Sequence, residues 1–361
     1  MHDVLVVGAG PAGSRLARRL AERGLDVLAF EQGTVGEPLA CSGHVSTDIW
    51  EFTPEGARER LLQNTIRGAR FHPEGFDGEA HRFHRDEQIS AVIDRVALDR
   101  ELAEAARQAG AAVRENHTVV GLTERRDHVE LTVRGPDGLT HHRGRLVAGC
   151  DGPNSRVRTE TGLPDPEELL HGVLGFSDEP DHEAFVDVHL TVPRFFAWRI
   201  PRGEAGVEYG LATPPGAAVN ECFGEVTDAY DVEPDRRCSG LIPIGPPSTV
   251  TSGRVFLVGD AAGHNKPFTG GGILYGMTAA DCAAETIEPS DPATLADYER
   301  AWRAELAGDI RMGHLVRAGY SAPGPLQHTL MGLFEGEIGV HMDRPTTLFS
   351  REQLRAMLPR L

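Results

Sequence analysis

The chain has 361 residues, 40% of them hydrophobic, and its 54 acidic residues outnumber 36 basic ones to give a formal net charge of −18. The acidic balance argues against nucleic-acid binding, and no apolar run approaches the ~20 residues that span a bilayer. The five cysteines are widely spaced and form no Cys-x-x-Cys pair, so we expect neither a disulfide framework nor a metal site.

Lys266 is the only lysine among the basic residues. A lysine-poor, acid-rich surface is typical of proteins from salt-loaded, halophilic cytoplasm, but a genome that prefers arginine codons explains the composition equally well. The first residues enter an apolar strand with no basic leader, so we expect a cytoplasmic protein.

Residues 3–31 predict a strand, a tight glycine turn, an amphipathic helix and a second strand, which together form a βαβ unit. The turn has the pattern Gly-x-Gly-x-x-Gly, which lets a backbone approach a pyrophosphate at the positive end of a helix. Glu31 closes the second strand, where a carboxylate can accept hydrogen bonds from ribose hydroxyls. The residues expected at this end of a dinucleotide are Gly8, Gly10, Pro11, Ala12, Gly13, Glu31 and Gln32.

The middle of the chain predicts a helix followed by several strands. A helix is expected at 95–109, strands at 111–124, and a hairpin at 128–152 that turns at 136–138. Residues 172–213 predict several further strands.

A second glycine cluster lies late in the chain, after an apolar strand at 254–260 and before a helix at about 273–287. An NAD site needs no such distant acidic loop, so the ligand is expected to be longer, with Asp260 binding ribityl hydroxyls and the helix amides facing a reduced flavin. We therefore predict that FAD lies with one end on each glycine loop. The residues expected at this end are Gly259, Asp260, Gly270, Gly271, Gly272 and Ile273.

From Ala293 onward the pattern is mostly helical and arginine-rich, with a break at 321–326. The predicted fold class is α/β, with a Rossmann-type FAD-binding domain interrupted by a β-rich substrate domain and followed by a helical C-terminal tail. The expected boundaries are 1–160 with 250–290 for the FAD-binding domain, 161–249 with part of 60–90 for the substrate domain, and 291–361 for the helical C-terminal region.

Over nearly its whole length the chain resembles the FAD-dependent geranylgeranyl reductase family, within the wider class of flavoproteins related to aromatic hydroxylases. The wider class is indicated by CDGPNSRVR at 150–158. The reductase family is indicated by GDAAG followed by KPFTGGGI, by CSG at 41–43, and by FAWRIP at 196–201. The last motif departs from the family pattern at Ile200, where an aromatic residue is usual, and this departure affects the expected shape of the substrate tunnel.

The resemblance implies that Cys41 and Ser42 lie near the flavin ring, and that Arg95 and Val119 contact FAD. It also implies substrate contacts by Phe196, Trp198 and Pro201. Hydroxylases of this fold usually have His and Asn at the positions of Gly263 and Ile273. Halogenases need a catalytic lysine near the substrate, whereas Lys266 lies in the expected flavin loop. We therefore do not expect a halogenase.

The implied reaction is reduction of an isolated C=C bond, with hydride from reduced flavin and a proton from a nearby donor. Cys41 and His44 are the candidate catalytic residues. Phe195, Phe196 and Trp198 are candidates for an apolar channel wall, with burial in a core as the alternative. For Cys41 the alternative is a buried, inert thiol.

The expected substrate is an isoprenoid lipid or a prenyl diphosphate, and ferredoxin and NAD(P)H both remain open as electron donor. The alternatives to a reductase are an FAD-dependent monooxygenase of a small hydrophobic substrate and a flavoprotein that only relays electrons. The arginine-rich tail allows peripheral contact with anionic lipid at the inner membrane face, or it forms a solvated helical face paired with its own acids.

Overall fold

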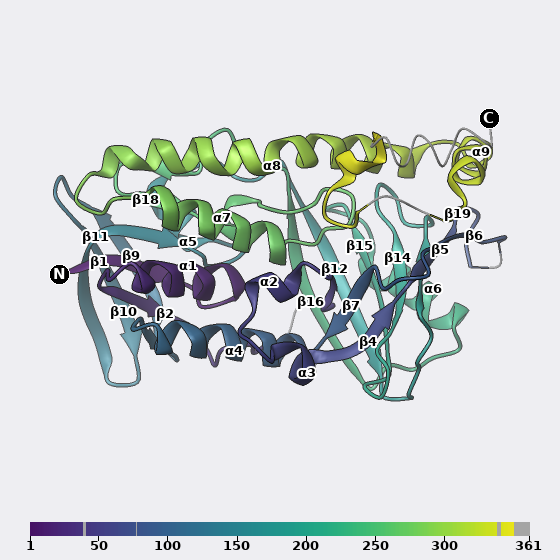
Figure 1. Cartoon of the computed structure of the whole chain (residues 1–361), viewed down its shortest axis with the longest axis horizontal. Helices are drawn as coiled ribbons and strands as arrows, with labels where there is room; N and C mark the ends of the chain where they lie inside the picture. Colours follow the sequence, from purple (N-terminus) through teal and green to yellow (C-terminus); the bar gives the residue numbers. More distant parts are fainter. Residues whose placement is uncertain (39–40, 77, 338–340, 350–361) are drawn as a thin grey trace.

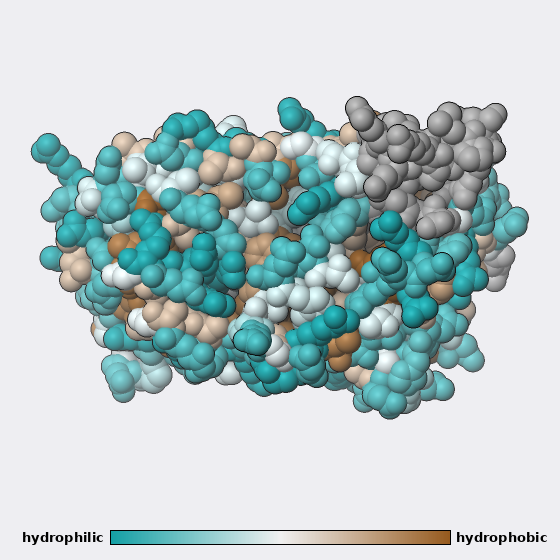
Figure 2. Space-filling view, viewed as in Figure 1, coloured by the Kyte–Doolittle hydropathy of each residue, from teal (hydrophilic) through white to brown (hydrophobic). Residues whose placement is uncertain are grey.

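The computed structural model describes residues 1–38, 41–76, 78–337 and 341–349. Two large sheets lie towards opposite ends of an elongated molecule, and the long helix α8 runs along both of them (Figure 1). Hydrophilic residues cover most of the face shown in Figure 2. Among the described helices, none combines the length and apolar character that crossing a membrane requires.

The first sheet has a parallel centre that forms because its strands are apolar on both faces. Its strand order is β17-β18-β11-β1-β2-β8, and β9 and β10 extend the first half of β11 as an antiparallel meander. The strands are β1 (His2–Val7), β2 (Val27–Phe30), β8 (Ala112–Arg114), β9 (Thr118–Glu124), β10 (Val129–Gly135), β11 (Gly138–Gly149), β17 (Thr251–Ser252) and β18 (Val255–Leu257). The N-terminal unit and the late strand therefore belong to one sheet, as predicted.

The helix α1 (Pro11–Glu22) packs against both α4 (Arg95–Gln108) and α7 (Ile273–Thr286). Small residues allow α1, α7 and the turn η1 (Gly259–Ala262) to approach closely. A Cβ atom on Gly276 would lie 3.1 Å from the Cα of Gly259 and 3.3 Å from the Cβ of Ala12. This packing brings the two glycine clusters together, although about 250 residues separate them along the chain.

The second sheet has the order β16-β12-β15-β14-β13-β5-β6-β19. Its strands are β5 (Gly68–His72), β6 (His81–His84), β12 (Glu168–Ser177), β13 (Phe185–His189), β14 (Ala197–Pro201), β15 (Val207–Thr213), β16 (Arg236–Ile244) and β19 (Gly336–Glu337). Helix α6 (Val219–Ala229) packs on β12 and β15. A small third sheet pairs β7 (Ser90–Ile93) with β3 (His44–Ser46) and β4 (Leu62–Ile66).

The remaining described elements are short helices and the C-terminal helices. They are α2 (Ile49–Phe52), α3 (Ala57–Leu61), α5 (Arg156–Thr161), η2 (Pro292–Thr294), α8 (Leu295–Ala318), η3 (Gly319–Ser321), α9 (Gly324–Phe334) and η4 (Pro345–Phe349). The predicted break at 321–326 overlaps the interruption between α8 and α9, although α9 already begins at Gly324. Residues 350–361 of the predicted helical region lie outside the described residues, and the predicted domain boundaries stay a prediction.

Candidate active site

A cavity of about 350 Å³ is enclosed by segments from both large sheets and from the loops between them. One wall is rich in glycine and polar side chains, and the other wall is formed by β12, β14 and β16. The lining residues are Gly10, Pro11, Ala12, Pro38, Cys41, Ser42, His44, Val45, Arg95, Cys150, Gly152, Gly172, Leu174, Trp198, Gly240, Leu241, Ile242, Val258, Gly259, Asp260, Asn265, Lys266, Thr269, Gly270, Gly271, Gly272, Ile273, Leu274 and Gly276.

The N-terminal glycine loop is held tightly against the end of β11. A Cβ atom on Gly8 would lie 2.3 Å from the carbonyl oxygen of Cys150, and one on Gly13 would lie 2.1 Å from the carbonyl oxygen of Gly8. Helix α1 begins without a side-chain cap, so its first amides remain available at the cavity. The carboxylate of Glu31 accepts a hydrogen bond from the amide of Ala9 at 2.8 Å, which braces the same loop.

The late glycine segment places Asp260 and the start of α7 on the same cavity. Helix α7 also begins without a side-chain cap. A Cβ atom on Gly272 would lie 1.9 Å from Oδ1 of Asn265, so any larger residue would require the Asn265 amide to move. Burial raises the pKa of Asp260 to about 6, although a hydrogen bond from Asn265 and the charge of Arg95 oppose the rise.

The Asp-Gly motif at 151–152 lies between β11 and α5, and α5 contacts the turn η1 that contains Asp260. The carboxylate of Asp151 accepts hydrogen bonds from Ser155 Oγ at 2.6 Å and from the amide of Val157 at 3.0 Å. The guanidinium of Arg158 donates to the carbonyl of Ala261 at 3.0 Å. The motif therefore holds the turn that carries Asp260 in place.

The loop after residue 40 brings Cys41 and His44 to the cavity. The buried guanidinium of Arg95 pairs with Asp99 and also interacts with the thiol of Cys41. Nε2 of His44 lies 2.8 Å from Oγ of Ser90. Burial, with the charge of Lys266, lowers the pKa of His44 to about 4, so this imidazole is neutral at neutral pH.

Trp198 is oriented by a buried ion pair behind the cavity wall. Its Nε1 donates to Glu208 at 2.8 Å, and Glu208 accepts from Arg202 at 2.9 Å. Arg202 also donates to the carbonyl of Ser42 at 2.5 Å. The pair thus connects the loop of Cys41 with the strand that carries Trp198.

The structure brings most of the predicted site residues into this one cavity. Those that line it are Gly10, Pro11, Ala12, Cys41, Ser42, His44, Arg95, Trp198, Gly259, Asp260, Gly270, Gly271, Gly272 and Ile273. Gly8, Gly13 and Glu31 support the loop from behind, whereas Gln32, Val119, Phe196 and Pro201 are not among the lining residues. Val119 is in β9 within the core of the first sheet, and Phe195 and Phe196 stack at 4.4 Å in the core of the second.

Sequence reasoning missed the apolar wall formed by Leu174, Leu241 and Ile242. Gly172 in β12 pairs directly with Gly240 in β16, and the two missing side chains leave space on the sheet face. A glycine inside a strand pattern often indicates that a ligand or backbone approaches closely. These two glycines were the available signal.

The polar groups of the cavity fit a polar, anionic cofactor such as FAD. Nε of Arg95 and Oδ1 of Asn265 are buried and have no hydrogen-bond partner among the described residues. Buried polar groups without partners are rare in folded proteins. A ligand with donors and acceptors would satisfy these groups, and its phosphates would suit the uncapped start of α1.

Comparisons with known proteins agree with this geometry. A family model described as an FAD binding domain matches residues 1–193. The digeranylgeranylglycerophospholipid reductase of Methanosarcina acetivorans is 30% identical over 346 residues, covering 88% of this chain and 84% of the relative.

Solved structures are also similar. A geranylgeranyl bacteriochlorophyll reductase-like protein from Thermoplasma acidophilum superposes with a TM-score of 0.85 at 21% identity, covering 99% of this chain and 98% of that one. The p-nitrophenol 4-monooxygenase of Pseudomonas putida superposes with a TM-score of 0.74 at 19% identity, covering 99% and 96%. At these identities the two structures establish the fold, and they confirm the predicted fold class.

Proposed function

Because the chain belongs to the FAD-binding family that includes the digeranylgeranylglycerophospholipid reductases, we propose that it saturates C=C bonds in the isoprenoid chains of a geranylgeranyl lipid. The chain is an FAD-dependent oxidoreductase. The observation that carries the proposal is the two-sided cavity. Uncapped helix ends and glycines suit FAD on one wall, while Leu174, Trp198 and Ile242 suit a hydrocarbon chain on the other.

In this proposal the two glycine segments hold the two ends of FAD. The start of α1 binds the pyrophosphate, Glu31 accepts from the ribose, and Asp260 accepts from the ribityl hydroxyls. The amides at the start of α7 face the ring. The other cavity-lining residues assigned to cofactor contact are Cys41, Ser42, Arg95, Gly259 and Ile273. Gly8, Gln32 and Val119 do not line the cavity, and their contact with FAD stays a prediction.

Reduced FAD, when bound, supplies the hydride for one alkene carbon. The apolar wall aligns the lipid chain and excludes water, and Trp198 keeps its orientation through Glu208. We assign proton donation to the thiol of Cys41, with Arg95 beside it to stabilise the thiolate that remains. Neutral His44 keeps a positioning role, because its pKa of about 4 leaves almost no imidazolium at neutral pH.

The test is an anaerobic reaction of FAD-loaded protein with dithionite and either a digeranylgeranyl glycerophospholipid or geranylgeranyl diphosphate. Mass analysis should find two added hydrogen atoms per reduced bond, and the preferred substrate identifies the headgroup. Ferredoxin and NAD(P)H then replace dithionite in turn to identify the donor. Unchanged lipid, together with oxygen-dependent insertion of an oxygen atom into a small substrate, would contradict the proposal and favour a monooxygenase.

A further inference from the structure

Lys266, the only lysine of the chain, lies on the cavity wall with 4% of its surface exposed. Its amide donates to the carbonyl of Gly271 at 3.1 Å, and its carbonyl accepts from Gly270 at 2.8 Å. A Cβ atom on Gly271 would lie 3.2 Å from Nζ of Lys266. The ammonium group is therefore placed beside the glycines that precede α7.

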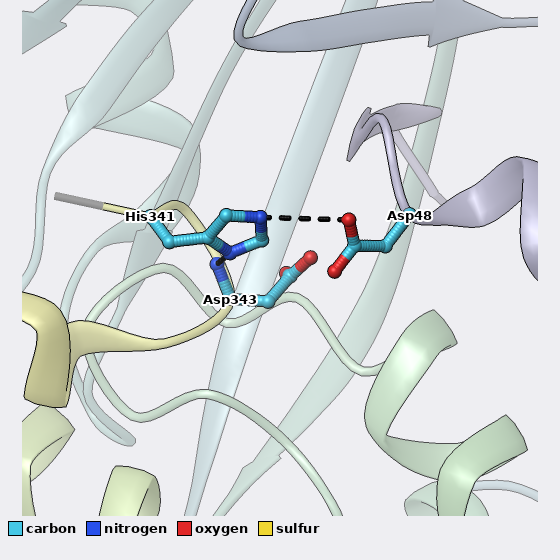
Figure 3. Close-up of side chains that lie close together, drawn as sticks. All are labelled: Asp48, His341 and Asp343. Atoms are coloured by element: carbon cyan, nitrogen blue, oxygen red, sulfur yellow. Dashed lines mark hydrogen bonds and ion pairs between the residues drawn. The ribbon is translucent and has the colours of Figure 1, made fainter. Parts of the chain in front are cut away.

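Asp343 forms an ion pair with Lys266 from a segment near the C-terminus, residues 341–349. This segment is seated by several contacts. Oη of Tyr275 donates to the carbonyl of Asp343 at 2.7 Å, and Thr346 binds Asp309 on α8. Figure 3 shows the side chain of His341 directed at Asp48, with Nε2 and Oδ1 3.5 Å apart.

The carboxylates around this segment already face cations. Asp48, His341 and Asp343 lie close enough together to ligate a metal ion. However, Lys266 pairs with Asp343, and Arg344 lies 3.8 Å from Asp48. These positive groups balance both carboxylates, so the cluster is better described as an ion-pair network.

The fields of Lys266 and Asp343 both reach the cavity. Burial pushes the pKa of Asp343 upward, but Lys266, with Ser46 and His341, more than offsets this, so the pKa lies below its usual value and the carboxylate stays ionised. At His44, which lines the cavity, Lys266 lowers the pKa and Asp343 opposes it. Buried charges are only weakly screened by solvent and salt.

We propose that Lys266 and Asp343 form an electrostatic pair that sets the electron affinity of FAD bound in this cavity. The inference rests on the proposed placement of the flavin ring beside Gly270–Gly272. Uptake of two electrons and one proton converts the neutral oxidised ring into an anion. A nearby cation stabilises that anion and a nearby carboxylate destabilises it.

Replacing the two residues one at a time should therefore shift the midpoint potential of bound FAD in opposite directions. In Lys266→Met the carboxylate is left alone, so the midpoint potential of bound FAD becomes more negative. In Asp343→Asn the ammonium is left alone, so the midpoint potential becomes more positive. Each shift should correspond to at least a tenfold change in the two-electron equilibrium constant, which is about 30 mV. Lys266→Arg keeps the charge and should lie near the unmodified protein, and the double variant should lie between the two single variants.

The potentials are measured without lipid, by titration against a dye of known potential, at pH 8.5 for Lys266→Met and pH 6.5 for Asp343→Asn. The higher pH favours an ionised carboxylate and the lower pH favours an ammonium, and the unmodified protein is measured at both. Asp309→Asn is the matched control, because it loosens the same segment without removing a charge from the cavity. Equal potentials, shifts of one sign, or an Asp309→Asn shift equal to that of Asp343→Asn would overturn the inference.

If Lys266→Met does not fold, Asp343→Asn still tests the sign of the shift, with Lys266→Arg as the variant that keeps the charge. Alkene reduction is measured separately. If the protein takes up FAD and the two variants show the predicted shifts of opposite sign, but no lipid is reduced, the proposed function is refuted and the electrostatic pair is supported.

Discussion

Asp260 should destabilise the protein when FAD is removed. Burial raises its pKa from 3.8 to about 6. Between these values the folded apo protein binds more protons than the unfolded chain, so the free energy of unfolding falls as the pH rises. The pKa difference corresponds to about 3 kcal/mol. Asp260→Asn lacks this cost, so above pH 6 the apo variant should be more stable than the unmodified protein by up to about 3 kcal/mol.

Urea unfolding of dilute apo protein from pH 4.5 to 8 measures this difference. Asp137→Asn, at an exposed hairpin turn, is the control and should change nothing. FAD should reverse the order, because the variant loses the carboxylate assigned to the ribityl hydroxyls and binds the cofactor less tightly. If the apo variant is equally or less stable at pH 7.5, the reasoning about buried charge at Asp260 is refuted.

Three further predictions concern the loop of Cys41 and its support. Arg202→Met leaves the fully buried Glu208 without its cation and should cost about 3–5 kcal/mol in urea unfolding. Adding Glu208→Gln should recover part of that loss, and a Glu208→Gln effect that simply adds to it would count against a coupled pair. His44→Gln should leave the pH dependence of lipid reduction between pH 5.5 and 8 unchanged, because His44 has a pKa of about 4. Loss of a titration step in that range would show that His44 does change charge there. Cys41→Ala should retain the visible spectrum of bound FAD while the rate of lipid reduction falls by about a hundredfold or more. Unchanged turnover would remove the thiol from the mechanism.

The glycine loops were predictable because close contacts at several of their positions leave no room for a side chain. At Gly8, Gly13 and Gly272 a Cβ atom would lie within 2.3 Å of another atom. At Gly8 and Gly13 the clashing atom belongs to the backbone, so another residue would require a backbone shift, and at Gly272 the side chain of Asn265 would have to move. Their spacing relative to the apolar strands before them therefore predicts both halves of the proposed cofactor site.

The charge partners were not predictable, because nothing local in the sequence pairs them. Lys266 and Asp343 are 77 residues apart, and Arg202 donates to Ser42 from 160 residues away. Phe196 shows a related limit. An aromatic residue before a half-buried strand suits a channel wall or a core, and only the sheet packing places it against Phe195 and Tyr320.

Each positively charged side chain at or behind the cavity wall is paired with a carboxylate. Arg95 pairs with Asp99, Lys266 pairs with Asp343, and Arg202 behind the wall pairs with Glu208. Each cation thus has its own acid, so none is left as an isolated buried charge facing a hydrocarbon chain. In the proposed site, the remaining attraction for an anionic cofactor is assigned to the uncapped backbone amides at the starts of α1 and α7. Because those amides are fixed by the glycine turns, FAD affinity should depend on the turns and its electron affinity on the ion pair at Lys266.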